Sequence, residues 1–255
     1  MSVPEITLTV AGGADDAPLV VLGPSLGTSA ILWEDVVPAL ETSFRVIAWD
    51  LPGHGASPAA TSPFTVAELA DAVAAEVGEP FLYAGVSLGG AVGLTLALRH
   101  PDRVRRAAIV ASGAQLGDPD SWAQRAAQVR AQSTSSLLSA SASRWFAPES
   151  VAREPDLAGR LLHVLQNADD ESYARCCEAL AGYDVRARLG GIAVPVLAVW
   201  GEYDAVAPEP KAAEIAQGVR AGRSAEVADA AHLPPAEQPS AVAELLLRFF
   251  EEETP

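Results

Sequence analysis

Residues 81–90 read FLYAGVSLGG, and this stretch decides the fold. Its first four residues are apolar and form a run typical of a strand that is buried on both faces. Gly85 and Gly89 lie two residues before and after Ser87, and an apolar, helix-like segment follows at residues 90–100. A serine in so tight a turn needs small neighbours at both places. The stretch therefore predicts a strand, a sharp turn with Ser87 at its tip, and a helix.

The same alternation of short apolar runs and helical periods continues on both sides of this stretch. Thr65 and Glu68 form a capping box that opens a helix, and Gly78 is a natural end for it. Strand, helix, strand repetition is typical of a parallel, doubly wound sheet, so we expect an α/β protein. The expected strands are residues 19–22, 44–49, 81–84, 107–110 and 194–200, and a terminal helix is expected at residues 240–249.

The pattern changes between Asp118 and Arg188, where helix-like stretches rich in serine and alanine contain no convincing strand. We interpret residues 118–188 as a helical lid inserted into one core domain. That core domain would be formed by residues 1–117 and 189–255 together, since no repeat and no linker separates independent domains.

Composition and charge exclude several classes of function. The chain has 255 residues, 49% of them hydrophobic, which is enough for a substantial core. With 17 basic and 33 acidic residues, its net charge of −16 opposes binding to nucleic acid and to anionic membranes. The adjacent Cys176 and Cys177 indicate no disulfide framework, and the N-terminus from Met1 lacks a basic start followed by an apolar run. We therefore expect a cytoplasmic protein with no membrane association.

A serine hydroxyl becomes an effective nucleophile only when a base takes its proton and a carboxylate orients that base. His232 lies in a turn-rich loop before the terminal helix, and Asp204 lies just after the strand that ends at Trp200. The order Ser87, Asp204, His232 is the order expected for such a strand-turn-helix serine. Glu202 is the alternative acid.

The other three histidines are weaker candidates for the base. His54 lies in a glycine-rich turn and could act as a base, but a structural role is favoured there. His100 precedes a proline at a helix end, which is typical of a C-terminal cap. His163 lies among leucines of the lid and is expected to pack in its interior.

Acyl transfer also requires two N–H donors for the developing oxyanion. The N–H of Leu88, directly after the serine, is the first candidate. The second should come from the loop after the strand at residues 19–22, where Pro24 has no N–H. We choose Leu26, with Ser25 as the alternative.

At this point the chain resembles a family of the α/β-hydrolase fold, the 3-oxoadipate enol-lactonases. The resemblance covers nearly the whole chain and rests on five motifs: SLGT at 25–28, GVSLGG at 85–90, RWF at 144–146, YARCCEAL at 173–180 and HLPP at 232–235. The stretch DLPGHG at residues 50–55 departs from the family, where a basic residue is more common at 51 or 52. This form also occurs in esterases and C–C bond hydrolases of the same fold.

The resemblance implies a serine hydrolase that opens a small enol lactone bearing an acetate group, giving 3-oxoadipate in the breakdown of aromatic compounds. It implies no metal and no cofactor, and no metal-ligand cluster, dinucleotide fingerprint or phosphate loop occurs in the sequence. The competing interpretations are a carboxylesterase or C–C hydrolase acting on another small carboxylated substrate, and a ligand-binding module without catalysis.

A carboxylated substrate needs a local positive group in so acidic a protein, and a guanidinium binds a carboxylate through two hydrogen bonds. Arg144 is the first candidate, with Trp145 shaping the pocket wall. The alternative is that Arg144 is a solvated surface residue and Trp145 a core residue of the lid. The lid offers further candidates in Trp122, Arg125, Tyr173 and Cys177, but aromatic and cysteine side chains in a lid are usually packing groups.

Overall fold

The computed structural model describes residues 3–153 and 155–252, and within them the chain forms a seven-stranded sheet. The strand order is β1-β3-β2-β4-β5-β6-β7; β1 is antiparallel to β3, and every other neighbouring pair is parallel. The strands are β1 (Thr7–Gly12), β2 (Leu19–Gly23), β3 (Arg45–Asp50), β4 (Phe81–Val86), β5 (Val104–Val110), β6 (Val196–Gly201) and β7 (Gly222–Val227).

Burial follows position in the sheet. Every residue of the central strands β2 and β4 is buried, whereas the edge strands β1 and β7 consist largely of exposed or half-buried residues. Central strands covered on both faces need continuous apolar runs, which is the pattern that the sequence shows. The prediction of a mostly parallel α/β sheet is confirmed.

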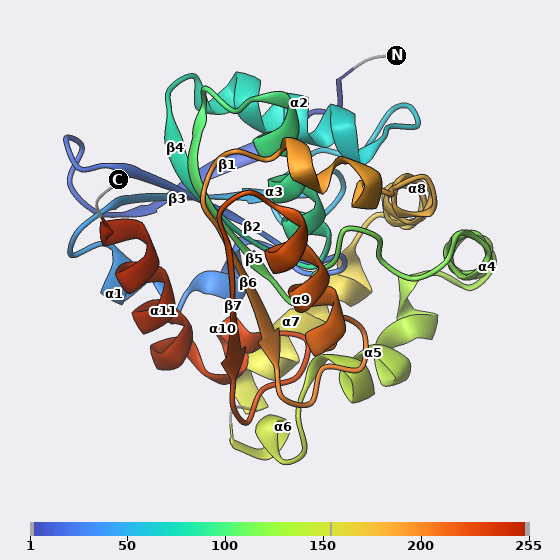
Figure 1. The fold of residues 1–255 in the computed structure, drawn as a ribbon. Coiled ribbons are helices and arrows are strands. Elements are labelled where there is room, and N and C mark those ends of the chain that lie inside the picture. Colours follow the sequence, from blue (N-terminus) through green and yellow to red (C-terminus); the bar gives the residue numbers. More distant parts are fainter. Residues whose placement is uncertain (1–2, 154, 253–255) are drawn as a thin grey trace.

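Helices cover both faces of the sheet (Figure 1). The helices α1 (Val37–Leu40) and α11 (Pro239–Glu251) pack together on one face, and α2 (Val66–Val77), α3 (Leu88–Arg99) and α9 (Glu209–Gly218) cover the other. The predicted capping box of α2 is present, with Thr65 Oγ1 and the Glu68 carboxylate each bonded to the other residue's N–H. Two short elements complete the core, η1 (Ala30–Trp33) and α10 (Pro234–Glu237).

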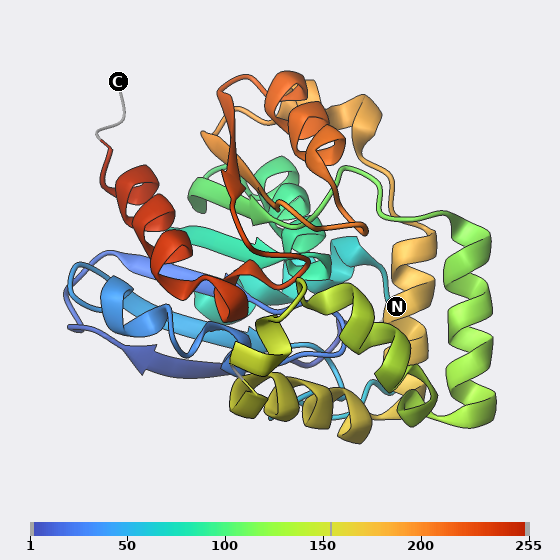
Figure 2. The ribbon, with the colours of Figure 1, turned by 90° about the horizontal axis from the view of Figure 1, so that it is seen from below.

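The segment between β5 and β6, here called the cap, is helical throughout its regular elements. These are α4 (Pro119–Gln132), η2 (Thr134–Leu137), α5 (Leu138–Trp145), α6 (Ser150–Arg153), α7 (Pro155–Asn167), α8 (Asp170–Ala181) and η3 (Arg186–Gly191). Figures 1 and 2 show α4 and α8 side by side at the edge of the molecule. The expected lid boundaries, 118 and 188, fall at the N-cap of α4 and inside η3.

The sheet has a topological switch point between β2 and β4. From β2 the next strand in the chain, β3, is added on one side, and from β4 the following strands, β5 to β7, are added on the other side. Gly23 at the end of β2 lies beside Gly85 of β4 in the parallel ladder. The loops after both strands therefore meet at one edge of the sheet, which is where ligands bind in open α/β folds. No helix in the described part of the chain is long and apolar enough to cross a lipid bilayer.

Candidate active site

Ser87 sits at the tip of the turn between β4 and α3 in a strained backbone conformation, with φ 54° and ψ −111°. A non-glycine residue with positive φ is held there only when its surroundings fix it. Two bonds do so: the Ser87 N–H donates to the Val110 carbonyl at 2.9 Å, and the Ser112 hydroxyl donates to the Ser87 carbonyl at 2.7 Å. The strand end of β5 thus clamps the turn.

The glycines at 85 and 89 are required by close backbone approach. A Cβ at Gly85 would lie 2.4 Å from the carbonyl of Gly89, and a Cβ at Gly89 would lie 2.6 Å from the carbonyl oxygen of Pro24. The N–H of Gly89 donates to that same Pro24 oxygen at 3.0 Å, which fastens α3 to the loop after β2. Gly85 and Gly89, the small neighbours expected from the sequence, are therefore required because any side chain at either position would clash with nearby backbone atoms.

His232 and Asp204 meet across the loops that follow β7 and β6. The His232 Nδ1 lies 2.9 Å from Asp204 Oδ2, and both residues are buried, with 3% and 4% of their surface exposed. The other carboxylate oxygen of Asp204 accepts hydrogen bonds from the N–H groups of Val206 and Ala207. Burial alone would raise the pKa of Asp204, but His232 and these two N–H donors outweigh it and hold that pKa below its usual value. Asp204 is thus held ionised beside the imidazole.

The alternative residues lie elsewhere. Glu202 is exposed, and its carboxylate accepts a hydrogen bond from the Asp229 N–H. His54 is buried, its Nδ1 is 2.9 Å from the Pro52 carbonyl oxygen, and burial lowers its pKa to about 4. None of these groups contacts Asp204 within the described residues.

For the two remaining histidines, the expectation for His100 is confirmed and the expectation for His163 is wrong. His100 is the C-cap of α3, as predicted, and its Nε2 lies 2.7 Å from Asp71. His163 is exposed on α7, so the prediction that it packs inside the lid is wrong. The apolar face of α7 is formed by the leucines around it, and its own position in the helical turn points outward.

The loop after β2 presents free N–H groups next to the turn of Ser87. The Ser25 N–H already donates to the hydroxyl of Thr28 at 3.0 Å, which removes Ser25 as a donor. In the described part of the chain, no acceptor is bonded to the N–H of Leu26 or of Leu88. Leu88 is the first residue of α3, where the N–H has no partner inside the helix.

A cavity of about 540 Å³ joins these groups to the cap. The core lines it with loop residues that include Ser87, His232 and Leu26, and the cap lines it with residues of α4, α5 and α8. Pockets of a few hundred cubic ångströms typically hold small molecules. The groups capable of acyl transfer therefore face a space of the right size for a small substrate.

Several cap residues on the cavity wall carry charge or rings. Arg144 is exposed and Trp145 is buried, and both residues line the cavity. Three of the further lid candidates, Tyr173, Trp122 and Arg125, also line the cavity. Cys177 is buried, and burial raises the pKa of its thiol to about 12, so it remains a packing group.

The charge of the cavity differs from that of the whole chain. Arg125 and Arg144 have no ion pair with a carboxylate among the residues that the structure describes. Arg125 stacks on the Trp122 ring at 5.1 Å and hydrogen-bonds the Tyr173 hydroxyl. The carboxylate that lines the cavity, Asp118, accepts hydrogen bonds from the N–H and hydroxyl of Ser121 as the N-cap of α4. Arg125 and Arg144 are thus available to bind an anionic group of a ligand.

Sequence analysis missed two residues that shape the site. Ser112 clamps the turn of Ser87, and Glu237 hydrogen-bonds the residue before His232. Neither belongs to a motif, and both act through partners that are adjacent only in the folded chain. The described residues contain no group of three or more His, Cys, Asp or Glu side chains arranged to hold a metal ion.

Comparison with known proteins agrees with this architecture. Residues 18–239 match the family model of the alpha/beta hydrolase fold. The 3-oxoadipate enol-lactonase 2 of Acinetobacter baylyi is 32% identical over 233 residues, which cover 90% of this chain and 87% of that protein. A pimeloyl-[acyl-carrier protein] methyl ester esterase of Neisseria meningitidis is 33% identical over 235 residues, covering 88% and 90% of the two chains.

Solved structures give the same result. The crystal structure of the enol-lactonase from Burkholderia xenovorans superposes with a TM-score of 0.93 at 33% identity and covers 98% of this chain and 97% of its own. The resemblance to 3-oxoadipate enol-lactonases, expected from the sequence, is confirmed. By family model, relatives and structure alike, this chain belongs to the α/β-hydrolase fold family.

Proposed function

We propose that this protein hydrolyses 3-oxoadipate enol-lactone to 3-oxoadipate in the catabolism of aromatic compounds. The observation that carries the proposal is the cavity itself. Ser87 and His232 line it together with Arg125 and Arg144, two guanidinium groups without a carboxylate partner in the described residues. A chain of net charge −16 that keeps two such cations at its cavity is suited to an anionic substrate.

The first half of the reaction forms an acyl-enzyme. The hydroxyl of Ser87 attacks the lactone carbonyl while the Nε2 of His232 takes its proton, since the Nδ1–H is donated to Asp204. The N–H groups of Leu26 and Leu88 stabilise the oxyanion. The ring then opens as the bond to the ring oxygen breaks, and the enolate that leaves takes the proton from His232, which becomes neutral again. An enolate requires less help from a general acid than an alkoxide would.

The second half releases the product. A water molecule gives its proton to His232 and attacks the acyl carbon, and the bond to the Ser87 oxygen breaks as that oxygen is protonated again. The enol relaxes to the ketone, giving 3-oxoadipate. Arg144 binds the substrate carboxylate and Trp145 forms the wall against which the ring lies.

Similarity to the methyl ester esterases supports a second candidate, a carboxylesterase acting on a small acid's methyl ester. The same Ser87 and His232 would serve it, since an ester carbonyl undergoes the same attack. The two candidates differ in the leaving group, which is an enolate in one and methoxide in the other.

The test is a comparison of kcat/KM for 3-oxoadipate enol-lactone, a dicarboxylic acid monomethyl ester and p-nitrophenyl acetate, with Ser87→Ala as the control. A preference for the lactone of several orders of magnitude supports the lactonase. A preference for the methyl ester keeps the serine hydrolase and replaces the substrate. Activity that survives in Ser87→Ala would remove the serine mechanism altogether.

A further inference from the structure

A buried carboxylate that the proposed chemistry does not use joins the cap to the loop that carries His232. Glu237 ends α10, and only 8% of its surface is exposed. Its Oε2 accepts a hydrogen bond from the Ala231 N–H at 2.7 Å, and its Oε1 accepts one from the Ala147 N–H at 2.5 Å. Ala231 immediately precedes His232, and Ala147 belongs to the cap. One side chain therefore spans both parts of the molecule.

A second bond fastens the other side of His232 to the same cap segment. The Leu233 N–H donates to the carbonyl of Trp145 at 3.2 Å. Trp145 lines the cavity and is also packed against the loop after β2, because a Cβ at Gly27 would lie 3.2 Å from its ring. The backbone on both sides of His232 is thus tied to residues 145–147, on one side through Glu237 and on the other through a direct hydrogen bond.

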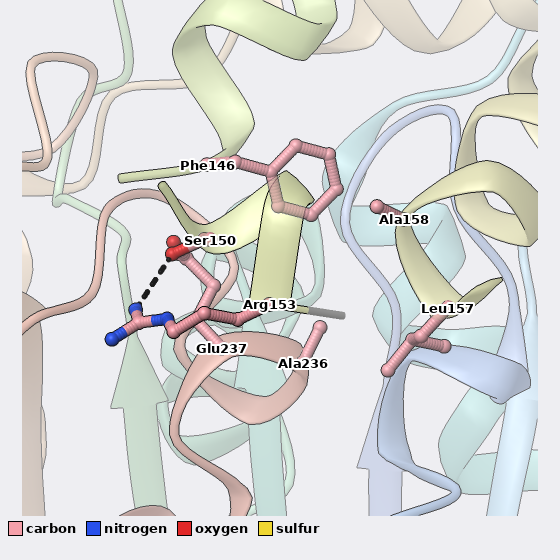
Figure 3. A pocket seen from close by; sticks show the side chains of 7 residues that line it. All are labelled: Phe146, Ser150, Arg153, Leu157, Ala158, Ala236 and Glu237. Atoms are coloured by element: carbon pink, nitrogen blue, oxygen red, sulfur yellow. Dashed lines mark hydrogen bonds between the residues drawn. The ribbon is translucent and has the colours of Figure 1, made fainter. Parts of the chain in front are cut away.

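Protein groups surround the Glu237 carboxylate, and each of its two oxygens accepts a hydrogen bond from a backbone N–H. The Ser150 hydroxyl, which accepts a hydrogen bond from Arg153 at 3.1 Å, belongs to the group of residues around Glu237. Figure 3 shows this cluster around a small void lined in part by Phe146. The void measures about 10 Å³, which is room for one water molecule at most. Burial raises the pKa of Glu237, and the N–H groups of Ala147 and Ala231 offset only part of that effect.

A buried carboxylate is unfavourable unless its hydrogen bonds are made, and an apolar side chain would pack here without that penalty. The two oxygens each meet a backbone donor from a different part of the molecule, which an apolar residue could not do. We propose that Glu237 is a positioning residue that couples docking of cap residues 145–147 to the placement of His232. The proposal rests on the serine mechanism above, but not on the identity of the substrate.

The decisive variant is Glu237→Gln, assayed with p-nitrophenyl acetate. The amide has one acceptor oxygen, and its NH₂ group would face an N–H donor, so one of the two backbone bonds is lost. A displacement of about 1 Å at a catalytic group can cost about 10²-fold in rate. We expect kcat to fall about 10- to 100-fold with KM changed less than about threefold, and the rate of fluorophosphonate labelling of Ser87 to fall by the same factor as kcat.

Two further variants separate positioning from stability and charge. Ser172→Ala cuts a different buried bond between cap and core, the one from the Ala60 N–H at 2.8 Å, and should keep kcat within about twofold. Glu237→Asp keeps the charge but is one methylene too short to reach both donors, so its kcat should fall as well. Values of kcat are expressed per site titrated with fluorophosphonate, so that unfolded molecules are not counted.

The results distinguish this inference from the proposed function. If Glu237→Gln keeps the wild-type kcat and loses only thermal stability, as Ser172→Ala would, then Glu237 is structural and the inference is wrong. If Glu237→Asp retains full activity while Glu237→Gln does not, the negative charge and not the pair of hydrogen bonds to Ala147 and Ala231 is responsible for the loss of kcat. That result would also overturn the inference. If Ser87→Ala still hydrolyses the ester, the serine mechanism fails independently of Glu237.

Discussion

The core and the cap are built in different ways although both line the same cavity. Strands β2 and β4 are buried at every residue, and Ser87, the proposed nucleophile, follows β4 directly. In α4 of the cap, by contrast, only Ala126 and Val129 are buried, and the helix is joined to α8 by ion pairs from Arg130 to Glu171 and Glu178. The reacting groups thus stand on a dehydrated scaffold and the substrate-binding groups on a solvated one.

This difference suggests a division of labour. Geometry within a fraction of an ångström is needed where bonds are made, and buried parallel strands supply it because close packing leaves no alternative positions. An outer cap helix such as α4, which has few buried residues and exposed ion pairs, is less stable and easier to change, so a family can alter its substrate there without altering its chemistry. Changes in the core should therefore abolish turnover, and changes in the cap should redirect it.

The largest effect is expected at the turn of β4. Ser87→Ala removes the nucleophile and should lower kcat by about 10⁶-fold, because no other group can form the acyl-enzyme. Circular dichroism should show an unchanged fold, since the turn is held through the backbone N–H and carbonyl of Ser87. Steady-state hydrolysis of the lactone measures the loss; residual activity within about tenfold of the wild type would contradict the assigned role.

Asp204→Asn should have the next largest effect, a fall in kcat of about 10⁴-fold, because the amide no longer holds the imidazole in the required tautomer.

The same Asp204→Asn substitution should also change how the stability of the protein depends on acid pH. The pKa of Asp204 is lowered by folding, so its contribution to the free energy of unfolding is present above its unfolded pKa of about 3.9 and is lost as pH falls through the folded value. Urea unfolding between pH 2 and pH 6 should therefore show a shallower acid loss in the variant. An identical pH dependence would contradict the ion pair.

The cap variant Arg144→Ala should reduce kcat/KM for the carboxylated lactone by about 10- to 100-fold, the value of one charge-assisted hydrogen-bonded contact. Hydrolysis of p-nitrophenyl acetate should be almost unchanged. Arg188→Ala, on η3 and absent from the cavity wall, is the matched control. Equal loss on both substrates would mean that Arg144 supports the cap and does not bind the carboxylate.

The smallest effect is expected for Arg130→Gln, which removes the ion pairs between α4 and α8. These side chains are about two-fifths exposed, so the free energy of unfolding should fall by less than about 1 kcal/mol at pH 7. Arg130 and Arg175 lower the pKa of Glu171 to about 2, so the stabilisation is present above its usual value of 4.5 and disappears as pH falls towards 2. A loss of several kcal/mol would show that the cap depends on this pair.

Much of the core was predictable because its signals are local. The capping box at Thr65 and Glu68, the end of α2 at Gly78 and the turn at residues 85–89 each involve residues that are neighbours in the chain. Their structure follows from steric and hydrogen-bonding rules that need no distant partner. The observed helix α3 starts at Leu88, two residues before the expected start, because the turn leads into it without a spacer.

The cap was harder to predict because its residues differ by which side of a helix they occupy. His163 was expected in the interior and is exposed, and Trp122 and Tyr173, aromatic side chains for which packing was favoured, line the cavity. Helical periodicity shows that a helix has an apolar face, but it does not show which neighbouring helix or cavity each other face meets.

The sequence by itself determined the sheet, the turn of Ser87 and the order in which serine, acid and histidine occur, since these depend on short-range periodicity and on small residues at fixed spacing. Only the tertiary structure decided that Asp204 and not Glu202 meets His232, that two arginines without carboxylate partners among the described residues face the cavity, and that Glu237 bridges cap and core. The physical reason is that hydrogen bonds and charges act over a few ångströms, and these residues come within that range only when loops distant in the chain pack together.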